Sequence, residues 1–407
     1  MTDVVVTGLG ATTPLGGDVT STWDALLAGR SGVSRIEADW VERHELPVKI
    51  AAQLAVDPSE VLKRVEARRM DRSEQVAVIA AREAWRHAGS PEVEPERLAV
   101  VIGTGIGGAV TLLAQDDILE NDGVRKVSPL TIPMLMPNGP AAHVGLEFGS
   151  RAGVHTPVSA CASGAEALAW AWRMLKADEA DVVIAGGADA CITGITLAGF
   201  TQMRAMCTTH NDDPERASRP FDAARDGFVL GEGAGIMVME RAEFAAARGA
   251  VVHGRLAGIG TSADAYHITG PDPEGVGQAR AMRAAIRSAG LTPSDIDHVN
   301  CHATSTPVGD VGEAVSIRSA IGDHPILTAP KGSLGHLLGA AGAVEGVAAL
   351  LAVRDGVIPP TANLENLDPR VHLDVVADEP RKAELIAALN GSFGFGGHNV
   401  ALVFTAA

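Results

Sequence analysis

Two separated segments of the chain carry the same succession of sequence signals. Residues 81–105, AREAWRHAGSPEVEPERLAVVIGTG, and residues 282–306, MRAAIRSAGLTPSDIDHVNCHATST, both show a helical pattern, an Ala-Gly stop, a proline turn, an acidic spacer and an apolar strand. Residues 161–187 and 335–360 form a second matching pair, in which a small-residue turn opens an apolar helix and a strand follows. A repeated α/β unit of this kind predicts a duplicated fold.

Short runs rich in valine and isoleucine alternate along the chain with alanine-rich segments of helical period. Examples are DVVVTG, LAVVIGTG and DVVIAGG against AVIAAREAWRHAG and ALAWAWRMLKA. This alternation predicts a layered α/β fold in which helices cover mixed or parallel sheets. The 407 residues, of which 46% are hydrophobic, suffice for one large core or two fused medium ones.

The charge and the aromatic content argue against nucleic acid as a partner. The net charge is −17 and aromatic residues make up 3% of the chain, so phosphate-binding surfaces and base-stacking platforms are scarce. The N-terminus, MTDVVVTGLG, lacks a signal-peptide pattern, and Glu345 interrupts the longest apolar run well short of a membrane span. We therefore expect a cytoplasmic protein that binds neither nucleic acid nor membrane.

The four cysteines form no C-x-x-C pair, and a chain of this size needs no disulfide framework, so we expect them to be reduced. Cys191, Cys207 and Cys301 are interpreted as small buried hydrophobic residues. Cys161 differs because it stands in PVSACASGAEALAWAW, at the junction of a strand end and a helix start.

A thiol at the start of a helix faces unpaired backbone N–H groups and the positive end of the helix dipole. This position favours the thiolate over the thiol, and the same N–H groups can stabilise an oxyanion. The small neighbours of Cys161 leave room for a substrate; they are Ala160, Ala162, Ser163 and Gly164. Two interpretations remain open at this point, a catalytic nucleophile and a buried structural cysteine.

Two histidines and a lysine occupy turns at matching points of the repeat. His302 follows a strand in VNCHATSTPVGD, and Lys331 and His336 flank a glycine-rich turn in APKGSLGHLLGAAG. A pseudo-twofold axis brings equivalent strand-to-helix turns together, so we expect these side chains to meet Cys161. A nucleophile, two imidazoles and backbone donors are the components of acyl transfer.

At this point the chain resembles the elongating β-ketoacyl-acyl carrier protein synthases (types I and II) of the thiolase superfamily. The motifs SACASG, HATSTPVGD, KGSLGH and GFGGHN carry the resemblance, which extends over essentially the whole chain. It implies a thiolase-like fold, a duplicated α/β motif in a layered αβαβα arrangement. It also implies a nucleophile half, residues 1–250, and a half with both histidines and a gate loop, residues 251–407.

The resemblance implies a 3-oxoacyl-[acyl-carrier-protein] synthase, an acyltransferase that elongates fatty acyl chains by two carbons. Cys161 would hold the acyl group as a thioester, with the N–H groups of Cys161 and Phe395 as the oxyanion hole and Phe393 and Phe395 in the gate. His302 and His336 would bind the malonyl thioester carbonyl during decarboxylation. No cofactor or metal is implied beyond the phosphopantetheine of the acyl carrier protein. The alternative is a ketosynthase of a type II polyketide or other specialised pathway.

The remaining site residues are assigned by the same resemblance. Lys331 is expected to pair with Glu345 and to order the site, and Asp310 and Glu313 to support His302 and Lys331, together with Thr304 and Thr306. Ile106 and Phe200 would line an acyl tunnel that residues 131–139 of a second copy close, which implies a homodimer. For carrier docking we expect one basic helical face and a nearby arginine, formed by Lys63, Arg64, Arg68, Arg69, Arg72 and Arg204.

The sequence leaves three other interpretations, a dinucleotide-binding enzyme, a zinc protein and a non-catalytic chain-length factor. GTGIGG at residues 103–108 and GLGATT at residues 8–13 follow strands, as in dinucleotide-binding enzymes, but neither fits G-x-G-x-x-G. A zinc site would need Cys161, Cys301, His302 and His336 to converge, although adjacent residues of a strand point to opposite faces. A non-catalytic chain-length factor shares the fold but lacks the nucleophile, which this chain retains.

Overall fold

The computed structural model describes residues 2–407 and joins eleven strands into one sheet. In order across the sheet they are β12 (Asp374–Val375), β10 (Ile326–Thr328), β9 (Ile296–Asn300), β14 (Ala387–Gly394), β15 (His398–Thr405), β8 (Gly254–Ala263), β1 (Val4–Thr12), β7 (Gly233–Arg241), β6 (Val182–Asp189), β4 (Leu98–Gly103) and β5 (Gly153–His155). The sheet has two halves, β5-β4-β6-β7-β1 and β10-β9-β14-β15-β8, with β12 added at one edge. Within each half the first two pairings are parallel and the next two antiparallel, so the predicted duplication is confirmed.

The two halves meet where β1 and β8 run antiparallel for only two residue pairs, Val5 with Arg255 and Val6 with Gly254. This junction lies on the pseudo-twofold axis, because β1 and β8 are the equivalent strands of the two copies. The second copy therefore begins with β8, after the short helix α11 (Ala242–Ala247).

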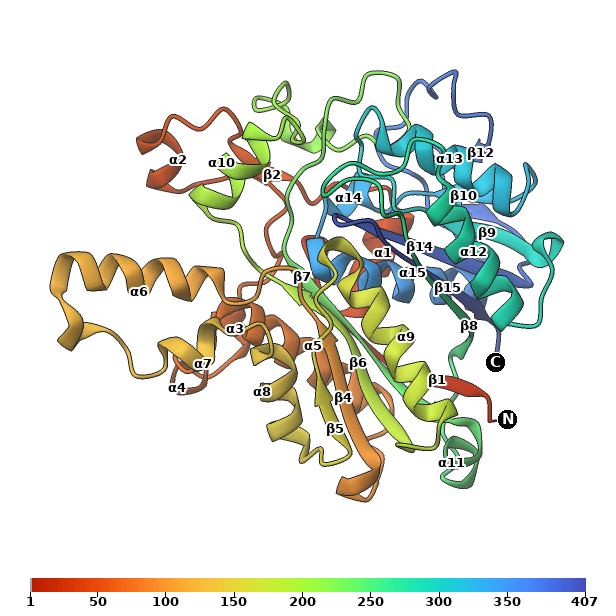
Figure 1. The fold of residues 1–407 in the computed structure, drawn as a ribbon, viewed down its shortest axis with the longest axis horizontal. Coiled ribbons are helices and arrows are strands. Elements are labelled where there is room, and N and C mark those ends of the chain that lie inside the picture. The colour runs from red at the N-terminus through yellow and green to blue at the C-terminus, as the bar shows by residue number, and fades with distance from the viewer. Residues whose placement is uncertain (1) are drawn as a thin grey trace.

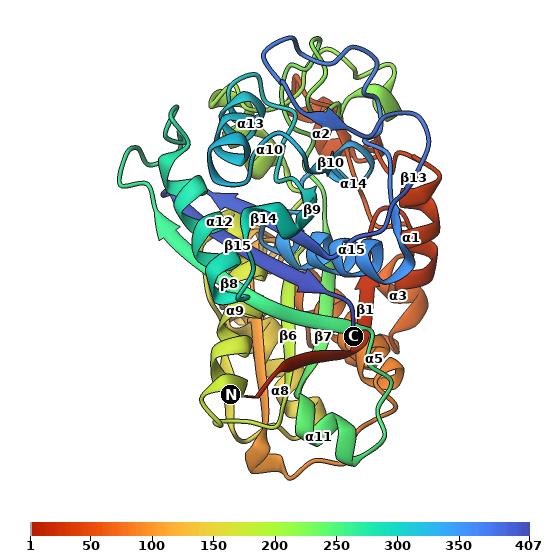
Figure 2. The same ribbon diagram turned by 90° about the vertical axis from the view of Figure 1, so that its right-hand side faces the viewer.

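Two helices fill the space between the halves, and others cover their outer faces (Figures 1 and 2). The inner helices are α9 (Ser163–Lys176) and α15 (Ala341–Asp355). On the outside, α5 (Arg72–His87) and α8 (Gly139–Phe148) cover the first half, and α12 (Val276–Ser288) and α13 (Gly309–Ala320) cover the second. Residues 341–353 are all buried, which explains why the sequence of α15 lacks a polar face. This is the expected αβαβα layering.

The predicted match between residues 161–187 and 335–360 is wrong for the final strand. Residues 357–358 form β11 (Val357–Ile358), which pairs with β13 (Arg381–Lys382) outside the large sheet. The strand equivalent to β6 is instead β14. Pro359 and Pro360 stop the extended run after β11, because proline cannot donate to a strand ladder. The chain rejoins the large sheet first at the short edge strand β12 and then at Ala387, where β14 begins.

The remaining helices and a small ribbon surround this core. They are α1 (Val19–Leu27), α2 (Asp39–Arg43), α3 (Pro58–Val61), α4 (Arg64–Ala67), α6 (Ala109–Asp122), α7 (Thr131–Leu135), α10 (Gly194–Gln202), α14 (Lys331–Leu334) and the paired β2 (Ser34–Arg35) and β3 (Ile50–Ala51). Helices α6 and α7 project from the body of the molecule (Figure 1). Among residues 2–407 every helix is too short or too polar to cross a membrane.

The crossing of the inner helices gives the first prediction. A Cβ atom at Gly342 of α15 would lie 2.8 Å from the Cβ and 3.0 Å from the N of Ala165 in α9, whereas a Cβ at Gly312 of α13 would meet nothing within 4 Å. Gly342→Ala should therefore lower the free energy of unfolding by about 1–3 kcal/mol through overpacking. Gly312→Ala, also inside a helix, should raise it by about 0.5–1 kcal/mol. Urea denaturation of both variants measures the difference, and equal effects would contradict the proposed helix contact.

Candidate active site

Cys161 lies in a one-turn 3-10 segment, η3 (Ala160–Ala162), that leads into α9. Ala160 has a φ of +50°, a left-handed conformation that is costly for alanine. The second copy repeats this turn as η6 (Leu338–Ala340) before α15, with Leu338 at a φ of +47°. There the position of Cys161 is taken by Gly339, whose Cβ would lie 2.3 Å from the backbone N of Gly105. Only the first copy has room for a side chain at this position of the turn.

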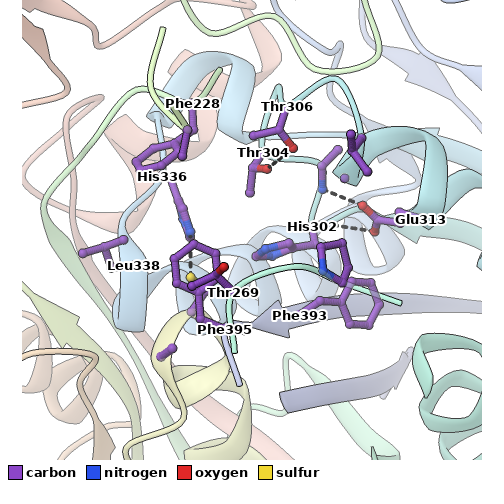
Figure 3. Close-up of a pocket in the computed structure, with 18 of the residues that line it drawn as sticks. Phe228, Thr269, His302, Thr304, Thr306, Glu313, His336, Leu338, Phe393 and Phe395 are labelled. Carbon is purple, nitrogen blue, oxygen red and sulfur yellow. Dashed lines mark hydrogen bonds between the residues drawn. The ribbon is translucent and has the colours of Figure 1, made fainter. Parts of the chain in front are cut away.

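His336 reaches the thiol from the second copy. Its Nε2 lies 3.0 Å from the Sγ of Cys161 (Figure 3). Two backbone hydrogen bonds hold its main chain, because its N–H donates to the carbonyl of Val229 and its carbonyl accepts from Gly231. The ring of Phe228 packs edge-on against the imidazole at 5.5 Å, which fixes the ring orientation.

His302 is fixed from two sides. The carboxylate of Glu313 accepts the backbone N–H groups of His302 and Ala303, at 2.7 and 2.6 Å. The Nζ of Lys331 lies 3.3 Å from His302 Nδ1. An ammonium group can only donate, so Nδ1 accepts and the imidazole proton sits on Nε2. The ring of His302 stands 5.5 Å from that of His336, nearly perpendicular to it, so both imidazoles lie beside Cys161.

Lys331 forms a buried ion pair behind the imidazoles. Its Nζ lies 2.5 Å from the Oε1 of Glu345, and both side chains are almost wholly buried. Lys331 is not among the residues that line the cavity beside Cys161. It therefore acts on His302 and on the local charge, without contacting the cavity.

Burial keeps the reacting groups neutral. It lowers the pKa of His302 and His336 well below the ordinary histidine value, and the charge of Lys331 lowers both further. Burial also raises the pKa of the Cys161 thiol to about 11, against the smaller opposing effects of Lys331 and the backbone N–H of Phe395. The expectation that the helix start favours a thiolate is wrong for the resting protein, because desolvation outweighs the local dipole.

The glycine-rich loop expected to act as a gate lies directly on the turn that carries Cys161. A Cβ at Gly394 would lie 2.5 Å from the carbonyl oxygen of Ser159 and 3.2 Å from the backbone N of Cys161, so this position needs glycine. The approach places the backbone N–H of Phe395 near the thiol, where it lowers the pKa. The ring of Phe393 packs 5.8 Å from that of His302.

These groups open into a cavity of about 590 Å³. Its lining includes the expected residues Ile106, Phe200, Arg204, Thr304, Thr306, Phe393 and Phe395. It also includes residues that sequence reasoning missed, among them Met203, Phe228, Asp264, Gln278, Leu338 and Asn399. The missed residues come from separate helices, strands and loops that only the folded chain brings together, and they carry no motif of their own.

Asp310 does not have its expected role. It accepts the backbone N–H groups of Phe221 and Thr306 and pairs with Arg225, whose Nε lies 3.3 Å away. Asp310, one helical turn before Glu313 in α13, therefore orders the turn that follows His302. Of these two carboxylates, it is Glu313 that binds the backbone of His302. Thr304 and Thr306 lie in that turn with their hydroxyl oxygens 3.2 Å apart.

Asp189 is a buried carboxylate that sequence reasoning missed. It accepts hydrogen bonds from the N–H groups of Gly105 and Gly339 and from the hydroxyl of Thr104, at 2.7–2.9 Å. Burial raises its pKa to about 6. The sequence does contain a signal for this carboxylate, because Asp189 ends the apolar run VVIAGGAD. An acidic side chain at the end of a buried strand must accept hydrogen bonds to offset the cost of its burial.

The basic segment expected to form one helical face is broken. Helix α4 covers only Arg64–Ala67, and a new helix, α5, begins after Asp71, whose carboxylate caps it. Arg72 belongs to the second helix and pairs with Glu232 and Asp57. The other four basic residues of this segment are exposed and do not line the cavity; they are Lys63, Arg64, Arg68 and Arg69. Arg204 is the member of the predicted basic set that lines the cavity.

The cysteine and histidine side chains do not assemble as a zinc site would require. Cys301 is buried in the core of the second half, whereas Cys161 contacts His336. Within residues 2–407 there is no group of three or more histidine, cysteine or acidic side chains suited to hold a metal ion.

The duplicated fold and a thiol beside two neutral imidazoles define a thiol-dependent acyltransferase. Family models of the β-ketoacyl synthase N-terminal and C-terminal domains match residues 1–245 and 253–365. The 3-oxoacyl-[acyl-carrier-protein] synthase 2 of Mycobacterium tuberculosis is 50% identical over 402 residues, which cover 98% of this chain and 96% of that protein. The chain belongs to the β-ketoacyl synthase family.

Solved structures agree with this assignment. A β-ketoacyl synthase from Burkholderia phymatum has a TM-score of 0.92 and 34% identity, with both chains fully covered. A type II polyketide ketosynthase, solved in complex with its acyl-carrier protein, has the same TM-score and 28% identity over 100% of this chain and 99% of that one. The thiolase-like fold is therefore established for this chain.

The neutral thiol gives a prediction about pH. Iodoacetamide reacts with the thiolate, and below a pKa of about 11 the thiolate fraction rises tenfold per pH unit. The alkylation rate of Cys161, followed by intact mass, should therefore still increase about tenfold between pH 8 and pH 9. The Cys161→Ala variant shows which label belongs to this residue. A rate that levels off below pH 8 would show a thiolate at rest.

Proposed function

We propose that the chain condenses an acyl group held on Cys161 with a malonyl group carried by acyl carrier protein, and so elongates fatty acyl chains by two carbons. The observation that carries this proposal is the convergence of Cys161, His302 and His336 on one cavity. The name of the 50% identical relatives supports acyl elongation over a specialised polyketide pathway, whose ketosynthase in complex with its carrier is 28% identical.

The first half-reaction transfers the acyl group. The sulfur of Cys161 attacks the carrier-bound thioester carbonyl, and the N–H groups of Cys161 and Phe395 stabilise the oxyanion. The thiol proton ends on the departing phosphopantetheine sulfur, and the Nε2–H of His336, 3.0 Å from Sγ, stabilises the negative charge that develops on the Cys161 sulfur. One thioester is broken and one is formed, so the step needs no oxidant or reductant.

The second half-reaction forms the carbon–carbon bond. Loss of carbon dioxide from the malonyl thioester leaves an enolate, whose oxygen accepts hydrogen bonds from the Nε2–H groups of His302 and His336. Two neutral donors placed in a buried site stabilise this charge strongly. The enolate carbon attacks the acyl carbonyl on Cys161, and the cysteine sulfur leaves and regains a proton. The product is a 3-oxoacyl thioester on the carrier.

A homodimer is part of the proposal. Strand β5 is an edge strand, and its surroundings expose large apolar side chains, including Ile132, Leu146, Val154 and Val158. An edge with unpaired backbone groups and apolar neighbours favours pairing with the same edge of a second copy. The α6–α7 projection, which contains residues 131–135, would then reach the partner. Sedimentation velocity of the purified protein checks this assembly.

The two half-reactions can be separated by substitution. Cys161→Ala should abolish the acyl-enzyme adduct and condensation. His302→Ala should keep adduct formation measurable by intact mass while carbon dioxide release from malonyl carrier protein falls about 10²–10³-fold, the typical cost of one lost oxyanion donor. His302 is the more selective target, because His336 also contacts the sulfur. Equal loss of both half-reactions would contradict the assigned roles.

Carrier docking is proposed for the exposed basic residues beside α4. Replacing Arg68 and Arg69 with glutamate should raise KM for acyl carrier protein substrates about tenfold or more at low salt, with little change for pantetheine thioesters. The matched control replaces Arg30 and Arg287, which are exposed, make no side-chain hydrogen bond with any residue from 2 to 407 and do not line the cavity. If carrier-bound and carrier-free substrates lose activity alike, docking lies elsewhere.

A further inference from the structure

A second cavity, of about 480 Å³, lies away from the active site, between α1, α5 and α15. Its lining consists of Val19, Thr20, Trp23, Glu83, Arg86, His87, Leu351 and Arg354, and shares no residue with the catalytic cavity. Figures 1 and 2 show α1 and α15 side by side at this place. The proposed condensation uses none of these groups.

The acidic groups in and around this cavity are already fully engaged. Both oxygens of Glu83 accept backbone N–H groups, from Ala11 at 2.8 Å and from Val19 at 2.9 Å. Burial raises the pKa of Glu83 to about 7, which reduces its negative charge at neutral pH. Asp355 accepts from the indole of Trp23 and from Arg354.

The basic groups, in contrast, have donors to spare. Arg86 makes no side-chain hydrogen bond or ion pair with any residue from 2 to 407, and Arg354 contacts only Asp355, which leaves its Nη1 free. His87 Nδ1 accepts the N–H of Leu9 at 3.1 Å, so the proton of this imidazole sits on Nε2. The hydroxyl of Thr20 is also unengaged. All four residues are exposed, and within residues 2–407 they have fewer acceptors than N–H and O–H groups.

These arginines do not serve the usual purpose of basic residues at helix ends. Arg86 and Arg354 stand in the last turns of α5 and α15, where such side chains commonly donate to the last carbonyl groups. Neither does so here. A protein with a net charge of −17 repels anions overall, so an anion would need a local group of positive charges, which Arg86 and Arg354 supply in this cavity.

We propose that this cavity binds a phosphate group, either the free ion or a phosphate monoester of a small molecule. Guanidinium groups match phosphate geometry and donate in pairs. The cavity supplies donors from two arginines, one imidazole N–H and one hydroxyl. A carboxylate has only two oxygens to accept hydrogen bonds from them, whereas a phosphate has three or four. The cavity volume leaves room for a small ester beside the head group.

Isothermal titration calorimetry with inorganic phosphate, glycerol phosphate and acetate at constant ionic strength tests the proposal. We expect one phosphate per chain at this site and at least tenfold weaker binding in the Arg86→Gln, Arg354→Gln double variant. Acetate should bind at least fivefold more weakly than phosphate. Competition by glycerol phosphate identifies a monoester site, and binding of the inorganic ion alone identifies a site for the free ion.

The matched control is the Arg280→Gln, Arg287→Gln double variant on α12, which removes the same charge from exposed arginines without side-chain partners. It should bind phosphate like the unchanged protein. Because Arg86 makes no side-chain hydrogen bond or ion pair with residues 2–407 and is exposed, its single Arg86→Gln variant should unfold within about 1 °C of the unchanged protein without phosphate, and lose the stabilisation that phosphate gives. Equal phosphate affinity in the cavity variants and the unchanged protein, or equal affinity for acetate, would overturn the assignment.

Discussion

The backbone contact between the turns that begin α9 and α15 is the constraint on which the site depends. A Cβ at Gly187 would lie 2.5 Å from the carbonyl oxygen of Gly339 and 2.8 Å from the Cα of Gly164. Asp189 joins the same region by accepting N–H groups from Gly105 and Gly339. Larger side chains would force the two halves apart. Small residues therefore let the inner helices begin side by side, and the reacting groups are placed relative to that contact.

The electrostatics of the site follow from the same close packing. Burial keeps Cys161, His302 and His336 in neutral forms, and Glu345 pairs with the charged Lys331. A neutral site with fixed donors stabilises negative charge only when that charge develops during reaction. The buried ion pair thus maintains the imidazoles as donors without taking part in bond formation.

The sequence predicted the duplication and the residues at the strand ends, because repeats and turn chemistry are local patterns. It could not predict quantities set by packing. The thiol pKa was misjudged because the helix start is visible in the sequence, whereas the burial of Cys161 by both copies is not. Arg68 and Arg72 were placed on one helix, although Asp71 between them begins a new one by capping. Asp310 was assigned to the wrong partner because its neighbours come from distant loops.

The two copies have diverged so that neither contains a complete site. The first copy supplies a side chain at the turn, Cys161, where the second has Gly339 and no space for one. The second copy supplies His302 after its strand, whereas Thr104 after β4 of the first copy donates to a structural carboxylate. A nucleophile from one copy and donors from the other can act on one substrate only at the pseudo-twofold contact. The duplication, with Cys161 at this turn in the first copy and Gly339 in the second, therefore creates the asymmetric cavity that an acyl chain and a malonyl group can occupy in turn.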